Sequence, residues 1–282
     1  MNQSVVLDWY LENKRDLPWR NTTSWGVMVS EFMLQQTPVN RVLPVWIEWL
    51  NRWPTPKDLA TEKRSEVIKA WGRLGYPRRA LRLHESSIII ARDFNNVVPQ
   101  NIEQLRTLPG VGEYTAAAIS AFAFGKSELV LDINIRRFFA RAIDGVQYPT
   151  SSPSNYERQI RAELIPEEGA LWAAATMEFG ALICTSKNPN CEACPLSDYC
   201  AWRRAGYPES EQKRKTQAWH GTDRQCRGTV VQALRDSPSL TKEKARELWP
   251  DAEQLEKALK TLIADGLIEP IGDRYQLAEA TD

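Results

Sequence analysis

Residues 101–124 read NIEQLRTLPGVGEYTAAAISAFAF. Apolar residues at helical spacing predict one helix over 101–106 and a second helix over 113–124. The stretch between them, LPGVG at 108–112, carries the Pro and Gly that end helices and form tight turns. Its two glycines let the backbone turn sharply and leave N–H groups exposed at the start of the second helix. Such N–H groups can donate to a phosphate, so this turn is a candidate anion site.

This turn has two interpretations. Two helices joined by a Gly-rich hairpin form the helix-hairpin-helix motif, through which proteins bind a DNA backbone without reading its sequence. The phosphate would then contact the backbone of Gly110, Val111 and Gly112. A helical turn with no ligand also uses glycine, so the turn alone does not distinguish the two.

Outside this stretch, apolar residues recur at helical spacing almost everywhere, and no convincing strand precedes the last twenty residues. We therefore expect a mostly α protein, with Ser24 as the N-cap of its second helix. The other predicted helices cover residues 4–13, 25–36, 40–52, 64–72, 78–93, 134–143, 153–163 and 168–183.

The end of the chain differs from the rest. Residues 205–223 are polar and contain the run Lys213-Arg214-Lys215, which is typical of an exposed linker. Residues 224–282 show three helical patterns and then two short alternating runs separated by Gly272-Asp273, which predict a β-hairpin. Three helices followed by a hairpin predict a small winged-helix-like domain, and a generic helical cap is the alternative.

Composition excludes some classes of protein and leaves others open. The chain has 282 residues, 43% hydrophobic and 26% charged, and no apolar stretch near the ~18 residues of a membrane span. Its start lacks a signal-peptide pattern, so we expect a cytoplasmic protein with no membrane association. Lys plus Arg and Asp plus Glu both total 36, so any DNA-binding face must be local. Residues 223–282 hold 9 basic and 12 acidic side chains, which makes the tail the poorer phosphate binder.

Four of the five cysteines form a metal-binding pattern, C-x6-C-x2-C-x5-C, at Cys184, Cys191, Cys194 and Cys200. In a cytosolic protein clustered thiols ligate metal more often than they form disulfides. Neither histidine lies nearby, so a four-thiolate zinc site and a [4Fe–4S] cluster remain. Only one short C-x2-C pair is present, which favours the [4Fe–4S] cluster.

Three carboxylates interrupt apolar segments. Glu31 lies in WGVMVSEFML at 25–34, and burial would raise its pKa toward that of a general acid working near neutral pH. Asp132 precedes a helix, where an N-cap is the ordinary role of Asp and is compatible with catalysis. Glu178 lies in an apolar run, where a salt-bridged core acid is the alternative to a functional role.

Together these motifs resemble the MutY-type adenine DNA glycosylases. The matching features are SEFMLQQT at 30–37, the hairpin with Glu113-Tyr114-Thr115 after it, Asp132-x-Asn134 and the four cysteines, in that order. The resemblance covers about residues 7–204 and implies a two-lobed helix-hairpin-helix glycosylase core. We expect a six-helix domain at 22–126, an iron–sulfur domain at 1–21 and 127–204, a linker at 205–223 and the winged-helix-like domain at 224–282.

The resemblance implies that a monomer excises adenine mispaired with 8-oxoguanine or guanine in double-stranded DNA, after flipping the adenine out. Glu31 would protonate the adenine, and Asp132 would stabilise the cationic sugar. Tyr114 and Asn134 would orient these groups. Relatives that form a Schiff base have lysine in place of Tyr114, so a monofunctional enzyme is expected. The positions implied to contact the adenine or the base opposite are Trp19, Arg20, Leu34, Gln36, Thr37 and Glu178.

This sequence departs from the family pattern at three places. Pro77 stands where better-known members have a second tyrosine that wedges into the duplex, and Ile133 replaces a small residue. The short tail replaces a Nudix-like domain that helps those members recognise 8-oxoguanine. Two alternatives remain: a thymine or damaged-pyrimidine glycosylase of the same superfamily, and a non-catalytic iron–sulfur DNA-binding regulator.

Overall fold

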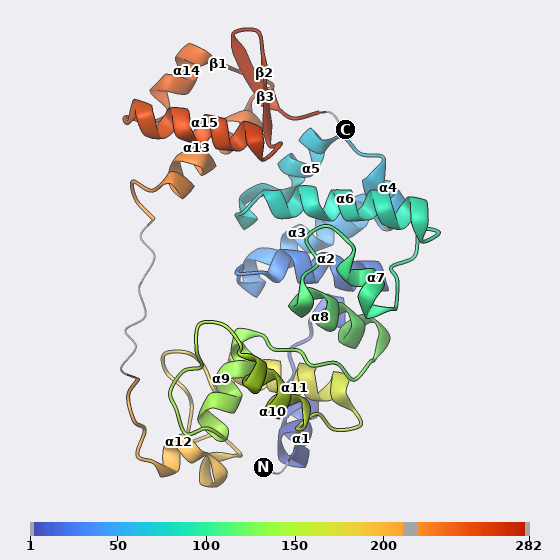
Figure 1. Cartoon of the computed structure of the whole chain (residues 1–282), viewed down its shortest axis with the longest axis vertical. Coiled ribbons are helices and arrows are strands. Elements are labelled where there is room, and N and C mark those ends of the chain that lie inside the picture. The colour runs from blue at the N-terminus through green and yellow to red at the C-terminus, as the bar shows by residue number, and fades with distance from the viewer. Residues whose placement is uncertain (1–2, 211–218, 280–282) are drawn as a thin grey trace. The chain divides into compact units, whose positions relative to one another are not determined.

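The computed structural model describes residues 3–210 and 219–279 (Figure 1). The chain forms two compact units. Unit 1 comprises Met1–Val27, Gln100–Arg106 and Val111–Arg214, and unit 2 comprises Met28–Pro99, Thr107–Gly110 and Lys215–Asp282. Residues 211–218 of the predicted linker lie outside the described residues, and the predicted domain bounds stay predictions.

Unit 1 is helical. Its elements are α1 (Gln3–Asn13), η1 (Pro18–Arg20), α7 (Ile102–Arg106), α8 (Glu113–Phe124), α9 (Ile133–Ala142), α10 (Asn155–Ala162), α11 (Gly169–Leu182), η3 (Ser197–Tyr199) and α12 (Ala201–Arg204). The nearly all-apolar helix α11 packs against α1 and α9 in the core of this unit. Phe179 of α11 is the centre of an aromatic cluster, with ring centroids 4.9 Å from Trp9 and 5.4 Å from Phe138.

Helix α2 (Ser24–Leu34) runs from unit 1 into unit 2. Unit 2 continues with α3 (Val39–Arg52), α4 (Pro56–Ala60), α5 (Arg64–Trp71), η2 (Gly72–Leu74) and α6 (Arg78–Asp93). The ring centroid of Trp49 lies 4.8 Å from that of Trp53 and 5.5 Å from that of Trp71. The Trp49 indole N–H donates to the carbonyl oxygen of Ala70 at 2.9 Å. These contacts join α3 to α5.

The predicted helices are confirmed to within about three residues, and the protein is mostly α as expected. The predicted N-cap of α2 is wrong by one residue, because Thr23 Oγ1 accepts from the Gly26 N–H at 3.2 Å and Ser24 lies in the helix. No described helix combines the length and the hydrophobicity of a membrane span.

Residues 223–279 form a small helical domain with a three-stranded antiparallel sheet, in the winged-helix order. The elements are α13 (Asp223–Asp236), β1 (Leu240–Thr241), α14 (Lys242–Glu247), α15 (Ala252–Ala264), β2 (Ile268–Ile271) and β3 (Arg274–Leu277). Strand β3 is central, pairing Tyr275 with Leu240 and Leu277 with Ile268. The predicted hairpin is therefore confirmed, and β1 is an addition to it.

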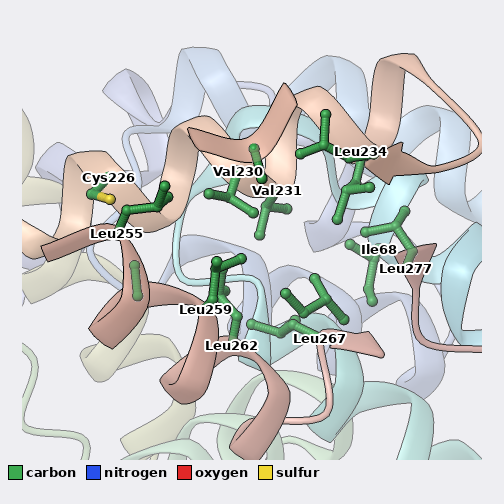
Figure 2. Packing of buried hydrophobic residues seen from close by; sticks show 14 of the residues in the cluster. Ile68, Cys226, Val230, Val231, Leu234, Leu255, Leu259, Leu262, Leu267 and Leu277 are labelled. Carbon is green, nitrogen blue, oxygen red and sulfur yellow. The ribbon is translucent and has the colours of Figure 1, made fainter. Parts of the chain in front are cut away.

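This C-terminal domain shares its core with the N-terminal part of unit 2. Ile68 of α5 and Leu81 of α6 belong to the same buried cluster as Cys226, Val230 and Leu262 (Figure 2). Arg235 of α13 donates to the carbonyl oxygen of Ile68 at 3.0 Å. The tail is thus packed onto α5 and α6 by apolar burial and by a partly buried hydrogen bond, which composition alone did not indicate.

Candidate functional site

The predicted site residues are divided between the two units. Unit 1 holds Trp19, Arg20, Val111, Gly112, Tyr114, Asp132, Asn134, Glu178 and the four cysteines, and unit 2 holds Glu31, Leu34, Gln36, Thr37 and Gly110. Within each unit the structure shows which of these residues are neighbours.

Asp132 is the N-cap of α9, as predicted from its position before the helix. Its Oδ1 accepts from the Ile135 N–H at 2.6 Å, and its Oδ2 accepts from Asn134 Nδ2 at 2.7 Å. Burial raises the pKa of Asp132, while these hydrogen bonds and the charge of Arg137 act in the opposite direction. Both carboxylate oxygens are therefore oriented by donors of the same helix.

Arg137 of α9 connects Asn134 to the cysteine loop. Its guanidinium donates to Asn134 Oδ1 at 2.8 Å, to the carbonyl oxygen of Gly180 at 2.5 Å and, from Nε, to the carbonyl oxygen of Cys184 at 2.8 Å. Gly180 permits this close approach, because a Cβ there would lie 2.6 Å from the carbonyl oxygen of Asn134. Continuous hydrogen bonds thus link Cys184, Arg137, Asn134 and Asp132.

Glu178 of α11 is a buried ionised acid. It pairs with Arg15 at 2.6 Å and with Arg20 at 3.0 Å, and it accepts from the Arg15 backbone N–H at 2.8 Å. Burial acts to raise its pKa, but the two arginines and this N–H outweigh burial, so the pKa is lowered. Glu178 and Arg20 are therefore brought together as expected, beside the buried Trp19, and Arg15 is a partner that sequence reasoning missed.

The hairpin after α7 has the tight turn that its glycines predict. Gly110 has φ +81°, and a Cβ there would lie 2.8 Å from Arg82 Cβ and 2.9 Å from the Phe32 ring, so the position requires glycine. Gly112 is the N-cap of α8, and Val111 is buried. Tyr114, in the first turn of α8, is half-buried against the unit 1 core.

Glu31 is buried, as its apolar surroundings predict. The residue is 6% exposed in α2, between Ser30 and Phe32, each 1% exposed. The helix ends at Leu34, which is half-buried, and Gln36 follows it with an exposed side chain and φ +56°. A carboxyl group at such a depth requires a specific partner or a function.

Arg79 of α6 organises the loop that follows α2. Its guanidinium donates to the carbonyl oxygens of Phe32 at 3.0 Å and Gly75 at 3.0 Å, to that of Gln35, and to Thr37 Oγ1 at 3.1 Å. Burial lowers the pKa of Arg79 to about 10, which leaves the group charged at neutral pH. No sequence motif indicates Arg79, because most of its acceptors are backbone oxygens, and those of Phe32 and Gln35 lie more than forty residues away in the sequence.

The four cysteines line one hollow in unit 1. The open hollow has an empty volume of about 320 Å³, and its wall also includes Arg141 and Trp202. Burial raises the pKa of Cys184, and it raises that of Cys194 to about 11, so a bound metal centre is needed to hold these thiols as thiolates. Four thiols that line one hollow have the donor set of an iron–sulfur cluster.

Arg141 of α9 holds the cysteine loop to the helix. This buried guanidinium donates to the carbonyl oxygens of Gln147 at 3.0 Å and Thr185 at 2.7 Å, lies 3.5 Å from Cys184 Sγ, and stacks 4.7 Å from the Trp202 ring. Its positive charge favours the thiolate of Cys184. Sequence reasoning missed Arg141, since its place on a regular amphipathic helix carries no motif.

Family models match both parts of this arrangement. Residues 29–162 match the HhH-GPD superfamily base excision DNA repair protein model, and residues 184–200 match the iron–sulfur binding domain of endonuclease III. The second match covers all four cysteines and identifies the loop as an iron–sulfur site.

Known proteins resemble this chain over most of its length. The adenine DNA glycosylase of Mycolicibacterium smegmatis is 45% identical over 279 residues, covering 97% of this chain and 94% of that protein. The Mycobacterium tuberculosis adenine DNA glycosylase is 47% identical, covering 95% and 90%. The match to the Mycolicibacterium smegmatis protein therefore includes most of the C-terminal domain.

Solved structures share the helical core. A thermostable thymine-DNA glycosylase has a TM-score of 0.66 at 28% identity, covering 72% of this chain and 95% of its own. Endonuclease III in a non-covalent complex with DNA has a TM-score of 0.63 at 20% identity, which shows the fold.

Proposed function

Because the chain belongs to the adenine DNA glycosylases of the HhH-GPD superfamily, we propose that it excises adenine mispaired with 8-oxoguanine or guanine in double-stranded DNA. Family membership makes it a base excision repair enzyme that hydrolyses the N-glycosidic bond of adenine. The identity of the opposite base, action as a monomer and a cytoplasmic location are parts of the proposal. An adenine inside a duplex is out of reach of side chains, so the enzyme flips the nucleotide out first.

The buried Glu31 carries this proposal. We infer that this carboxyl group, which is 6% exposed in an apolar helix, gives a proton to adenine and makes it a better leaving group. Asp132 has a second role in the reaction. Its carboxylate, oriented by the Ile135 N–H and by Asn134, stabilises the positive charge that develops on the sugar.

The pocket for adenine includes Trp19, Arg20 and Glu178. Glu178 is ionised and pairs with Arg15 and Arg20, so it fixes the Arg20 guanidinium and does not serve as a proton donor. Tyr114 stands where a Schiff-base lysine would be needed for strand cleavage, and a phenol cannot form that adduct, so the reaction ends at the abasic site.

The opposite base and the backbone are bound by separate elements. Gln36 and Thr37, with Leu34 before them, reach the base opposite adenine through amide and hydroxyl groups. The hairpin residues Gly110, Val111 and Gly112 present backbone N–H groups to a phosphate.

The iron–sulfur cluster, when bound to Cys184, Cys191, Cys194 and Cys200, supplies a metal centre that cross-links four points of the loop. Arg141 and Arg137 hold this loop to α9.

Single-turnover excision from four duplexes tests the proposal, with adenine placed opposite 8-oxoguanine, guanine, cytosine or thymine. We expect rates opposite 8-oxoguanine and guanine to exceed those opposite cytosine by at least about tenfold. Asp132→Asn is the matched variant for the role of the carboxylate charge. Asparagine keeps the shape of the aspartate side chain and one acceptor oxygen, but it loses the negative charge. Removal of thymine in place of adenine would support the pyrimidine alternative, and DNA binding without any excision would support the regulator alternative.

A further inference from the structure

Tyr76 is an exposed aromatic residue in an unusual backbone conformation. It lies between η2 and α6, is 43% exposed and has φ +47°, a left-handed value that a residue with a large side chain seldom adopts. The carbonyl oxygen of the preceding Gly75 accepts from Trp71 Nε1 at 2.9 Å, and the following Pro77 is the N-cap of α6. The surrounding structure therefore holds Tyr76 in this position.

Hydrogen bonds join the Tyr76 loop to the segment proposed to read the opposite base. Thr37 Oγ1 donates to the carbonyl oxygen of Leu74 at 3.1 Å. Arg79 donates to acceptors on both segments, and its guanidinium lies 5.6 Å from the centre of the Tyr76 ring. Tyr76 and Gln36 consequently lie on two loops that one half-buried arginine holds together.

The C-terminal domain supplies the second contact to Tyr76. Arg224, in the first turn of α13, donates from Nη1 to the Tyr76 hydroxyl at 2.9 Å, and its guanidinium lies 5.7 Å from the ring centre. The same guanidinium lies 4.9 Å from the ring of Trp219, which is 45% exposed. Arg224 of the C-terminal domain therefore contacts two exposed aromatic rings.

Helix α13 is held firmly enough to position Arg224. Its buried face packs with Ile68 and Leu81, as the cluster in Figure 2 shows for Ile68. Asp265 at the end of α15 pairs with Arg227 of α13 at 2.6 Å and with Arg78 of α6 at 3.2 Å. These contacts fix the start of α13 beside the loop that carries Tyr76.

We propose that Arg224 is a positioning residue that holds the Tyr76 ring in place to stack on a base beside the mispair. The C-terminal domain then contributes to mispair recognition without needing a positive surface of its own. Exposed aromatic rings stack on unpaired or opened bases, and an adjacent arginine limits the rotamers of the tyrosine. This inference rests on the proposed function of the protein as a mispair-specific glycosylase.

The test is a double-mutant cycle of Arg224→Ala and Tyr76→Phe in the full chain, measured as DNA binding. The probe is a duplex with a non-cleavable 2′-fluoro-adenosine opposite 8-oxoguanine, compared with a fully paired duplex. Tyr76→Phe keeps the ring and removes the hydroxyl that Arg224 binds. Arg274→Ala is the matched control, because Arg274 bonds to Ser239 within the C-terminal domain.

We expect Arg224→Ala to weaken binding of the mispaired duplex about tenfold and binding of the paired duplex less than about twofold. Adding Tyr76→Phe to Arg224→Ala should cause no further loss of binding. Arg224→Lys should restore part of the preference. Arg274→Ala should behave as the wild type in each measurement.

Three results would overturn the inference. Equal weakening of both duplexes, with a salt slope reduced by about one, would mean that Arg224 contacts a phosphate. Additive effects of the two substitutions would mean that the hydroxyl contact plays no part. Arg224→Ala behaving like Arg274→Ala would remove Arg224 from recognition. A wild-type protein without preference for the mispaired duplex would instead contradict the proposed function itself.

Discussion

Arg137 Nε donates to the carbonyl oxygen of Cys184 at 2.8 Å, and the same guanidinium donates to Asn134 Oδ1 at 2.8 Å. One buried side chain therefore connects the first cysteine of the iron–sulfur loop with the residue that bonds to Asp132. Because Arg137 is 3% exposed, water cannot replace these hydrogen bonds if the side chain is lost.

We predict that Arg137→Ala lowers the single-turnover rate of adenine excision by at least about tenfold, through loss of the orientation of Asn134 and Asp132. Arg137→Lys, which keeps the charge but not the fork of donors, should fall between this variant and the wild type. Arg106→Ala removes an exposed arginine paired with Glu103 and is the control. A rate for Arg137→Ala equal to that of the control would contradict the link.

The purified protein should be brown, with a broad absorption band at about 400 nm and about four irons per chain. The four thiols around one hollow, and the match of residues 184–200, are the basis for this expectation. Metal analysis by mass spectrometry checks it. One zinc and no iron per chain would contradict it.

Borohydride should trap no covalent adduct between the enzyme and its DNA substrate, because Tyr114 has no amine with which to form a Schiff base. The product should therefore be an intact abasic strand that breaks only on treatment with alkali. Gel electrophoresis before and after alkali measures this directly. Tyr114→Lys is an informative variant, since it places an amine where trapping becomes feasible. Strong trapping by the wild type would require another amine and a bifunctional mechanism.

Stability should fall as the pH is lowered from 7.5 to 5.5, in part because of His84. This residue is fully buried, and burial holds its pKa below the ordinary 6.5, with Glu62, Arg64 and Glu85 as smaller influences. Because the pKa of His84 is lowered in the folded chain, the unfolded chain binds a proton at this group more readily as the pH falls through 6.5, so acid favours unfolding. Urea unfolding at both pH values measures this change.

His84→Leu provides the comparison for this pH effect. It removes the titrating group and keeps an apolar side chain of similar size in the core, so its stability should change less over the same pH range. A pH dependence of the same size in both proteins would assign the effect to other groups.

Helix positions were predictable because the apolar spacing of each helix is a local property of the sequence. Helix α4 was missed, since Pro54 and Pro56 indicate a break, whereas Pro56 in fact occupies the first turn of a five-residue helix. Strand β1 was missed because two residues carry no alternation pattern.

Burial of Glu31 and capping by Asp132 were also predictable, because both depend on neighbouring residues in the sequence. Their partners were not. Arg15 meets Glu178 across 163 residues of sequence, and Arg224 meets Tyr76 across 148. Such pairs are created by the fold, and neither Arg15 nor Arg224 carries a motif of its own.

The packing of the tail onto α5 and α6 was likewise absent from the sequence pattern. Ile68 and Leu81 lie on helices whose apolar residues have ordinary spacing, and nothing in them indicates which element covers them. Since truncation before α13 would expose this shared core, point variants such as Arg224→Ala are the sharper test of what the tail does.

The most direct measurement is the single-turnover excision rate of Glu31→Gln on adenine opposite 8-oxoguanine, at saturating enzyme and with DNA binding measured in parallel. Glutamine keeps the shape of the buried side chain but cannot supply a proton, so we expect excision to be abolished and mispair binding to stay nearly intact. Excision within about threefold of the wild-type rate would contradict the account, because the buried acid would then not be required for the chemistry.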